Sequence, residues 1–295
     1  MENKRALFIT LIDDKVGFGH YKRTHILASE AFKLKWNIDF LVLTKKNDFE
    51  EIKDKRFTYF VQGSNIVKAL NLFIECNLIE KYDITLSDIV YIDLFKEYKS
   101  VKDIFRLISY LGILNCSIDA FGESSLFKKY IYDKIDFLII PYVTNDQYKE
   151  PKNTKIIYGN KFVILSDEYT NNIKRTIVDY PKKILITCGG SDFKNLTKEI
   201  LKSLNKIQHN LIIEVIIGPL FSNNNFTNIK QISDDSPHII RLIKHQNSLY
   251  ERLLWSDITI SASGLTKYEI AATGTPALLF STDEENHQIN KLFSK

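Results

Sequence analysis

The sequence predicts an α/β protein made of two doubly wound domains, each a parallel sheet with helices on both faces. Short apolar, β-branched runs alternate with longer helical patterns, and continuous apolar strands are typical of parallel sheets buried on both sides. This alternation occurs in two series, separated by a polar stretch at 144–182. We expect the carboxyl ends of the two sheets to face each other across a cleft, since ligands bind at that edge of such sheets.

The first series begins with an apolar run at 6–12, which predicts a strand, and continues with a helical pattern at 24–35. Further strands are expected at 39–43, 89–92, 114–118 and 137–140, with a further helix at 101–111. Asp93 and Asp119 directly follow two of these strands. The first domain is therefore predicted to be a β-α series with carboxylates at two of its strand ends.

The second series starts after Pro181, where the polar stretch ends. Its expected strands lie at 183–187, 211–217, 239–243, 258–261 and 277–280, and its expected helices at 196–207, 247–255 and 266–273. We place the domain boundary inside the polar stretch and divide the chain into domains 1–165 and 166–295.

Composition places the chain among globular proteins. It has 295 residues, 44% of them hydrophobic, with 19 Phe and 15 Tyr, which is enough to fill two cores. The 40 basic and 36 acidic residues are interspersed, so the net charge of +4 gives no support for a nucleic-acid partner. Cys76, Cys116 and Cys188 are widely spaced without a C-x-x-C pair, which is typical of reduced, structural thiols.

The start of the chain, Met1-Glu2-Asn3-Lys4-Arg5, is polar and leads into a short apolar strand, unlike a signal peptide or an anchor. No apolar stretch approaches the roughly 20 residues that a membrane span requires. We therefore expect a cytoplasmic protein without a membrane span. No pattern in the sequence indicates an oligomeric state.

Several common site motifs are absent from the sequence. Gly17-x-Gly19 lacks the third glycine of a dinucleotide fingerprint, and Asp39 precedes its strand where the ribose-binding carboxylate must follow it. The patterns G-x-x-x-x-G-K-[ST], G-x-S-x-G and H-E-x-x-H do not occur. The histidine spacings indicate no metal site, so we expect neither a metal nor a cofactor.

Three glycine-containing turns remain, at 17–20, 189–191 and 263–266, each at the carboxyl end of a predicted strand. Such a turn surrounds an anion with backbone N–H groups and the positive end of a helix dipole. The first turn also carries His20, and binding a phosphate does not require an imidazole. His20 therefore indicates that a group near the phosphate is attacked as well as held.

The third turn leaves two interpretations open. Thr266 is placed to cap the following helix with Glu269 at the third helical position, which is the pattern of a capping box. Alternatively, the start of this helix faces a diphosphate, and the Glu269 carboxylate accepts two hydrogen bonds from a ribose diol.

The motifs resemble those of the PseG family over nearly the whole chain. The matching segments are Gly17-x-Gly19-His20-x-x-Arg23, Ile184-Leu-Ile-Thr-x-Gly189-Gly190-Ser191-Asp192, and Ser261-Ala-Ser-Gly-Leu-Thr-x-Tyr-Glu269 with Gly274-x-Pro276. This family consists of UDP-2,4-diacetamido-2,4,6-trideoxy-β-L-altropyranose hydrolases of pseudaminic acid biosynthesis, which are similar in fold to MurG-type glycosyltransferases of the GT-B class. The resemblance thus implies a GT-B-like fold and a UDP-sugar substrate.

The resemblance also implies a mechanism and a set of site residues in the first domain. Family members hydrolyse the UDP-sugar at its anomeric carbon without metal and with inversion, and His20 corresponds to the histidine that activates the water. Gly17, Gly19 and Arg23 belong to the substrate or phosphate loop, with Arg23 either orienting this loop or meeting a phosphate. The candidate sugar-binding residues are Asp14, Asp93 and Asp119.

In the second domain the resemblance implies a UDP site. Its residues are Gly189, Gly190, Ser191, Ser263, Gly264, Leu265, Thr266 and Glu269. The third turn departs from the commoner family pattern, so its phosphate contact comes either from Ser263 or from the amides of Gly264 and Leu265. The chain also stops soon after Asn290, where relatives continue through a further helix, so it is either shortened or part of a longer protein.

Three classes of function stay open at this point. A hydrolase would use water as the acceptor and His20 as the base. An inverting glycosyltransferase would use the same histidine to deprotonate a sugar hydroxyl, and would need an acceptor pocket. A noncatalytic nucleotide-sugar binding domain would not require His20.

Overall fold

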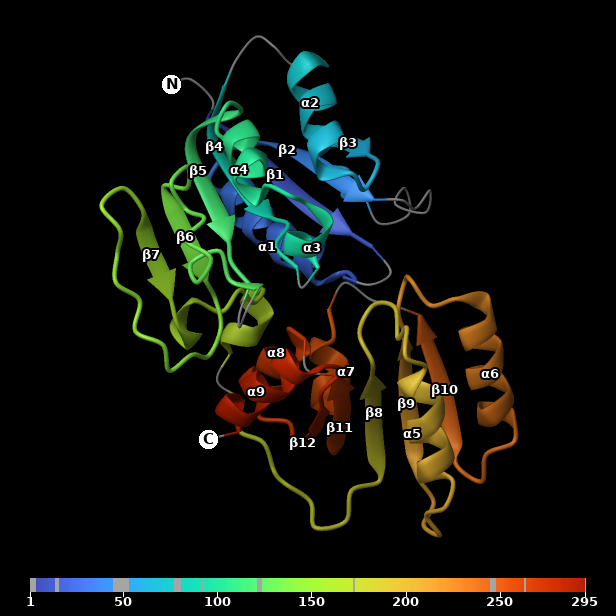
Figure 1. The fold of residues 1–295 in the computed structure, drawn as a ribbon. Coiled ribbons are helices and arrows are strands. Elements are labelled where there is room, and N and C mark those ends of the chain that lie inside the picture. The colour runs from blue at the N-terminus through green and yellow to red at the C-terminus, as the bar shows by residue number, and fades with distance from the viewer. Residues whose placement is uncertain are drawn as a thin grey trace. The chain divides into compact units, whose positions relative to one another are not determined.

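The computed structural model of the protein describes residues 4–13, 16–44, 53–76, 81–91, 93–120, 124–171, 173–244, 248–262 and 264–294. The chain forms two compact units, Met1–Ile164 and Leu165–Lys295 (Figure 1). Each unit is a parallel sheet with helices packed against it, which confirms the predicted α/β class with two parallel-sheet domains.

Unit 1 contains a parallel seven-stranded sheet with the strand order β3-β2-β1-β4-β5-β6-β7 in its described part. The strands are β1 (Arg5–Ile12), β2 (Asn37–Thr44), β3 (Thr58–Gln62), β4 (Tyr82–Asp88), β5 (Gly112–Ile118), β6 (Phe137–Ile140) and β7 (Lys155–Tyr158). The helices are α1 (Gly19–Lys33), α2 (Ile66–Cys76), α3 (Leu94–Glu97) and α4 (Val101–Ile108), followed by the short 3₁₀ helix η3 (Asn160–Phe162). Helix α1 packs against β1, β2 and β4, whereas α2 packs against α4.

The central strand β1 shows why this sheet forms. Its neighbours are β2 on one side and β4 on the other, and both faces are covered, so apolar side chains are required at successive positions. Leu7 and Ile9 point to one face and Phe8 to the other, and all three are buried. Phe8 stacks on Phe40 of β2, which joins the two strands beneath α1.

Unit 2 contains a parallel five-stranded sheet with the order β10-β9-β8-β11-β12 in its described part. The strands are β8 (Lys183–Thr187), β9 (Ile212–Ile217), β10 (Ile239–Lys244), β11 (Ile258–Ala262) and β12 (Ala277–Phe280). The helices are α5 (Leu196–Leu204), α6 (Asn223–Asp234), α7 (Tyr250–Trp255), α8 (Thr266–Ala272) and α9 (Glu284–Phe293), preceded by the 3₁₀ helix η4 (Asp167–Thr170).

The alternation along β8 builds a separate core on each face of this second sheet. Ile184 and Ile186 pack with Leu201 of α5 in one cluster. Leu185 packs with Leu253 of α7 and with α8 in the other. The centre of such a strand must be apolar at successive positions, as at 184–186, and for that reason its location could be predicted from the sequence.

The structure corrects several predicted elements of unit 1. The strand expected at 89–92 is wrong, because β4 occupies Tyr82–Asp88 and residues 89–91 are neither helix nor strand. The first helix begins at Gly19, five residues earlier than expected. Asp39 lies inside β2 and does not precede it.

None of the helices in the described residues combines the length and the apolar character needed to cross a bilayer.

Candidate active site

His20 lies in the first turn of α1, directly after the turn that follows β1. Gly17 adopts a φ of 79°, a left-handed conformation that favours glycine, and its N–H donates to the carbonyl of Asp13 at 2.7 Å. Helix α1 then begins at Gly19 without a side-chain cap and without an acidic residue in its first turn. Its positive end is therefore not neutralised by a capping side chain.

The two glycines of this turn leave its backbone accessible. A Cβ atom added at Gly17 or Gly19 would have no other atom within 4 Å. A ligand can therefore approach the backbone at the start of α1 closely, as a phosphate or sugar-binding turn requires.

The His20 side chain contacts Asp88, the last residue of β4. His20 is 8% exposed and Asp88 is 1% exposed, and Nδ1 of the imidazole lies 2.5 Å from Oδ1 of the carboxylate. Asp88 pairs with Thr10 in the register of β4 against β1, so both side chains share one face of the sheet. Because α1 packs against β1 and β4, this face brings Asp88 to the first turn of α1.

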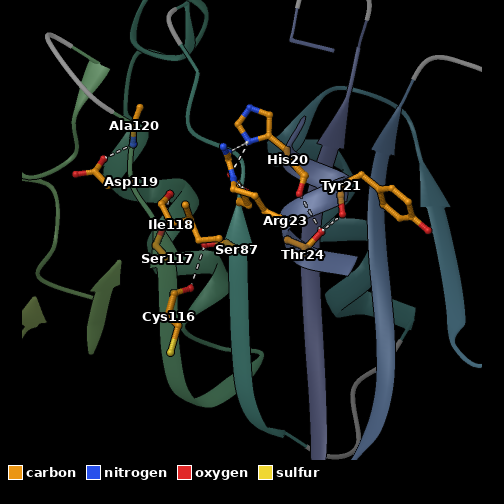
Figure 2. A network of polar contacts seen from close by, with 11 residues as sticks. His20, Tyr21, Arg23, Thr24, Ser87, Cys116, Ser117, Ile118, Asp119 and Ala120 are labelled. Atoms are coloured by element: carbon orange, nitrogen blue, oxygen red, sulfur yellow. Dashed lines mark hydrogen bonds and ion pairs between the residues drawn. The ribbon is translucent and has the colours of Figure 1, made fainter. Parts of the chain in front are cut away.

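Arg23 binds the same carboxylate from one helical turn further along α1. Its Nε donates to Oδ2 of Asp88 at 2.6 Å and its Nη2 donates to Oδ1 at 2.8 Å. Figure 2 shows the His20 and Arg23 side chains next to each other at this end of the sheet. The Tyr142 ring, which follows β6, lies 5.7 Å from the guanidinium carbon of Arg23. The structure thus brings together three charged or titratable groups from α1 and β4.

The ion pair stays charged although it is buried. Burial by itself raises the pKa of Asp88, but the charge of Arg23 and the hydrogen bonds from Arg23 and His20 outweigh it, and the net shift is downward. Burial likewise lowers the pKa of Arg23, but Asp88 and Tyr142 outweigh it and the net shift is upward. Asp88 is therefore a carboxylate that can only accept hydrogen bonds.

The charge of Asp88 determines the tautomer of His20. Because the carboxylate accepts only, Nδ1 carries the proton and the lone pair of the neutral imidazole lies on Nε2. Nη2 of Arg23 lies 3.1 Å from Nδ1, and since both groups carry protons, this contact is a close approach of two donors. The arrangement leaves Nε2 as the atom of His20 that can accept a proton.

The second glycine turn, at 189–191, directly follows β8 and Cys188. The Asp192 carboxylate accepts hydrogen bonds from the N–H groups of Leu196 at 2.8 Å and Thr197 at 3.1 Å. The start of α5 is thus neutralised by a carboxylate of the chain itself. The N–H groups of the turn are then the groups that this segment can offer to a phosphate.

The turn after β9 braces the second glycine turn. A Cβ atom added at Gly218 would lie 2.3 Å from the carbonyl oxygen of Gly190, and the N–H of Leu220 donates to that oxygen at 2.9 Å. On its own side Gly189 adopts a φ of 81° and has open space around an added Cβ atom. The turn is therefore fixed on one side and accessible on the other.

The third turn does not form the capping box that the sequence allowed. Helix α8 begins at Thr266, Leu265 occupies the N-cap position without a side-chain cap, and Glu269 therefore falls at the fourth helical position. Glu269 is 1% exposed, and Gly264 has open space around an added Cβ atom. Ser263 lies outside the described residues.

The candidate sugar-binding aspartates have different surroundings. Asp14 lies outside the described residues. Asp93 is at the start of α3, where its carboxylate forms an exposed ion pair with Lys96 at 2.9 Å. Asp93 was expected at the end of a strand at 89–92, but the strand in this part of the chain is β4, which ends at Asp88. The carboxylate at the strand end is therefore that of Asp88.

Asp119 anchors the segment that follows β5. Its carboxylate accepts hydrogen bonds from the N–H groups of Ala120, Leu126 and Phe127 and from the hydroxyl of Ser125. Burial raises the pKa of Asp119 to about 6, although these donors oppose the shift. Figure 2 shows its side chain turned toward Ala120. Its carboxylate therefore already holds the backbone of its own segment.

Within the part of the chain that the structure describes, no group of three His, Cys, Asp or Glu side chains is arranged to hold an ion.

Comparison with known proteins places these units among glycosyltransferase-like folds. Residues 183–291 match the Glycosyltransferase family 28 C-terminal domain. An uncharacterized protein of Methanocaldococcus jannaschii is 24% identical over 290 residues, which make up 94% of this chain and 56% of that protein. The chain thus spans about half the length of this curated relative.

Solved structures of other proteins share this fold. MurG of Acinetobacter baumannii is 15% identical with a TM-score of 0.60, covering 99% of this chain and 83% of that chain. Phytolacca americana UGT2, complexed with UDP-2-fluoro-glucose and pterostilbene, is 8% identical with a TM-score of 0.59, covering 97% and 82%. At these identities the likeness shows a shared fold, and the chain has the GT-B glycosyltransferase fold.

Proposed function

We propose that the protein hydrolyses a UDP-sugar at its anomeric carbon, with His20 as the base that activates water. The observation that carries this proposal is the contact between Nδ1 of His20 and the buried carboxylate of Asp88, which leaves Nε2 as a proton acceptor beside the uncapped start of α1. The motif resemblance to PseG proteins supports UDP-2,4-diacetamido-2,4,6-trideoxy-β-L-altrose as the substrate.

In the proposed reaction Nε2 of His20 takes a proton from water while the water oxygen forms a bond to the anomeric carbon. The bond between that carbon and the diphosphate oxygen breaks, and its electron pair leaves with UDP. The attack comes from the face opposite the diphosphate, so the configuration of the anomeric carbon inverts. Asp88 keeps the imidazole in the required tautomer and stabilises the imidazolium that forms.

Unit 2 is proposed to bind the UDP group. The match of residues 183–291 to a glycosyltransferase C-terminal domain supports this assignment. Because Asp192 already caps α5, the proposed phosphate contacts at the second turn are the N–H groups of Gly189, Gly190 and Ser191. At the third turn they are those of Gly264 and Leu265 at the start of α8, with Thr266 and Glu269 beside them.

An inverting glycosyltransferase is the second candidate. The family 28 C-terminal domain and the GT-B fold favour it as much as they favour a hydrolase. The chemistry of the base would be the same, since Nε2 of His20 would take a proton from an acceptor hydroxyl in place of water. The two activities differ in the acceptor alone.

An assay without acceptor separates the two candidates. The purified protein is incubated with a panel of UDP-sugars and no added metal, and UDP and free sugar are measured, with the anomer first released identified by NMR. We expect equal amounts of UDP and free sugar, with inverted configuration. Turnover that requires an added acceptor would establish the transferase and reject the hydrolase. Binding of UDP without turnover under either condition would reject both enzymes.

A further inference from the structure

We propose that Arg23 is a positioning residue that balances the charge of Asp88, so that Asp88 orients the His20 imidazole without favouring its protonated form. This inference rests on the proposed role of His20. It gives Arg23 a task different from a direct contact with the substrate phosphate.

The contacts of Arg23 leave little of it for a ligand. Nε and Nη2 both donate to the Asp88 carboxylate, at 2.6 and 2.8 Å. Arg23 is 8% exposed, and the buried ring of Tyr142 lies beside its guanidinium group. A phosphate ligand would need an arginine with its fork directed toward the ligand, whereas this fork grips a carboxylate of the protein.

The balance of charge around His20 explains why such an arginine is useful. A buried carboxylate next to an imidazole favours its protonated form, and a histidine that is already protonated cannot take a proton from water. The positive charge of Arg23, whose Nη2 lies 3.1 Å from Nδ1, opposes a second positive charge at this place. Asp88 can therefore orient the imidazole without keeping it protonated.

His20 contacts charged groups from two elements of the described residues. They are Asp88 from β4 and Arg23 from α1, with Tyr142, from the segment after β6, behind Arg23. Asp88 and Arg23 contribute opposite unit charges. These two charges therefore oppose each other in their effect on the imidazole.

The inference is tested by NMR titration of the histidine rings in the full chain, with the His20 signal assigned by its loss in His20→Gln. We expect Arg23→Gln to raise the titration midpoint of the His20 ring by about 1 to 3 pH units, since a neighbouring positive charge is removed. Asp88→Asn should lower the midpoint by a similar amount. The double variant, which removes both charges, should return the midpoint close to that of the wild type.

Two further variants distinguish charge from shape. Arg23→Lys keeps the charge but loses the two-pronged contact, so its midpoint should stay near the wild-type value. His25, on the same helix as His20, contacts Asp54, which in turn pairs with Arg56. Arg56→Gln removes this second arginine and should leave the titration midpoint of His20 unchanged. If Arg23→Gln does not fold, the midpoints of Arg23→Lys, Asp88→Asn and the double variant still show whether the charge of Arg23 opposes the protonation of His20.

The outcomes separate this inference from the proposed reaction. An unchanged His20 midpoint in folded Arg23→Gln, or a double variant that titrates like Asp88→Asn, would overturn the inference. Arg23→Gln that weakens UDP-sugar binding without moving the acid limb of kcat/KM would show that Arg23 is a phosphate ligand. If the wild type turns over no UDP-sugar, the proposed function fails, whereas the NMR shifts still test the balance of charge.

Discussion

Helix α1 carries two histidines, and each of them lies beside an aspartate and an arginine. The two clusters differ in how deeply these side chains are buried. The inner cluster consists of His20, Asp88 and Arg23, and the outer cluster consists of His25, Asp54 and Arg56. In the inner cluster the aspartate and arginine side chains are 1% and 10% exposed, whereas in the outer cluster they are 18% and 43% exposed. Both clusters thus contain the same three kinds of side chain, but only the outer cluster is readily reached by water.

The histidines also present different nitrogens to their aspartates. His20 meets its carboxylate through Nδ1 and keeps Nε2, the nitrogen farther from the backbone, for a ligand. His25 meets Asp54 through Nε2 at 2.9 Å, so its remaining nitrogen lies close to the helix. Arg56 donates both to Asp54 and to the hydroxyl of Ser29 and so ties a loop to α1. Under the proposed function the inner cluster prepares a base, whereas the contacts of Arg56 fasten the loop at 53–57 to α1.

The largest expected difference between the clusters is in turnover. His20→Ala should lower kcat/KM for the UDP-sugar by roughly 10²- to 10⁴-fold, which is the usual contribution of a general base. His25→Ala should change it only a few-fold. UDP release is the measurement for both variants, and the affinity for UDP should stay within a few-fold of the wild type in each. Similar losses in the two variants would show that the clusters do not differ in function.

A large difference is also expected in stability. Asp88→Ala leaves the buried Arg23 guanidinium without its carboxylate, and breaking such a buried pair costs about 3–5 kcal/mol. Asp54→Ala removes a partner from a partly exposed arginine and should cost about 1 kcal/mol.

Urea unfolding can measure this difference in unit 1 alone. Trp36 follows α1, so its fluorescence in a Trp255→Phe background reports on unit 1. Equal losses of unfolding free energy in the two alanine variants would contradict the greater burial of the inner pair. A smaller loss in Asp88→Ala than in Asp54→Ala would show that the inner pair does not stabilise the fold.

The inner cluster also shows how far sequence reasoning reaches. The glycine turn and His20 could be predicted, because they are adjacent in the chain and carry a recognisable pattern. Asp88 could not, because it lies 68 residues away and is brought to His20 by the register of β4 against β1. The signal that would have found it is an aspartate at the carboxyl end of the strand beside β1.

That strand was misplaced for a physical reason. Three polar residues of β4, Thr85, Ser87 and Asp88, are fully buried, and all three find hydrogen-bond partners inside the protein. Hydrophobic periodicity therefore fails along β4, and the apolar run that follows resembles a strand more closely than the strand itself. Strands such as β1 and β8, whose partners are apolar side chains on both faces, were predicted close to their true bounds.

The two edge strands of unit 1 were not predicted from the sequence, for a different reason. β3 and β7 lie at the two edges of the sheet of unit 1 and are only partly buried, and their apolar runs, at 59–61 and 156–158, are too short to identify a strand. In the second unit, the effect of Asp192 on α5 was also beyond sequence reasoning. Its carboxylate occupies the helix start that a glycine turn would otherwise offer to a phosphate.

The smallest expected effect concerns the pH dependence of stability, and it tests the outer cluster. Burial lowers the pKa of His25 below its ordinary value and Arg56 lowers it further, while Asp54 opposes the shift. The unfolded chain therefore binds the proton more readily than the folded one, and His25 should reduce stability as the pH falls from about 7.5 through its ordinary value of about 6.5. Asp54, whose pKa is lowered mainly by its hydrogen bonds to Arg56, loses its stabilising effect only below about pH 4.

Between pH 7.5 and 5 the difference between the wild type and His25→Gln isolates His25, since Asp119, whose pKa is raised to about 6, contributes equally to both. Urea unfolding of the wild type and His25→Gln across this range should show a smaller loss of stability on acidification in the variant, by a fraction of a kcal/mol. A larger loss in the variant would mean that folded His25 gains its proton more readily than the unfolded chain does. In that case Asp54 would raise the pKa of His25 more than Arg56 and burial lower it. An arginine would then balance the charge of an aspartate only where both are buried, as in the inner cluster.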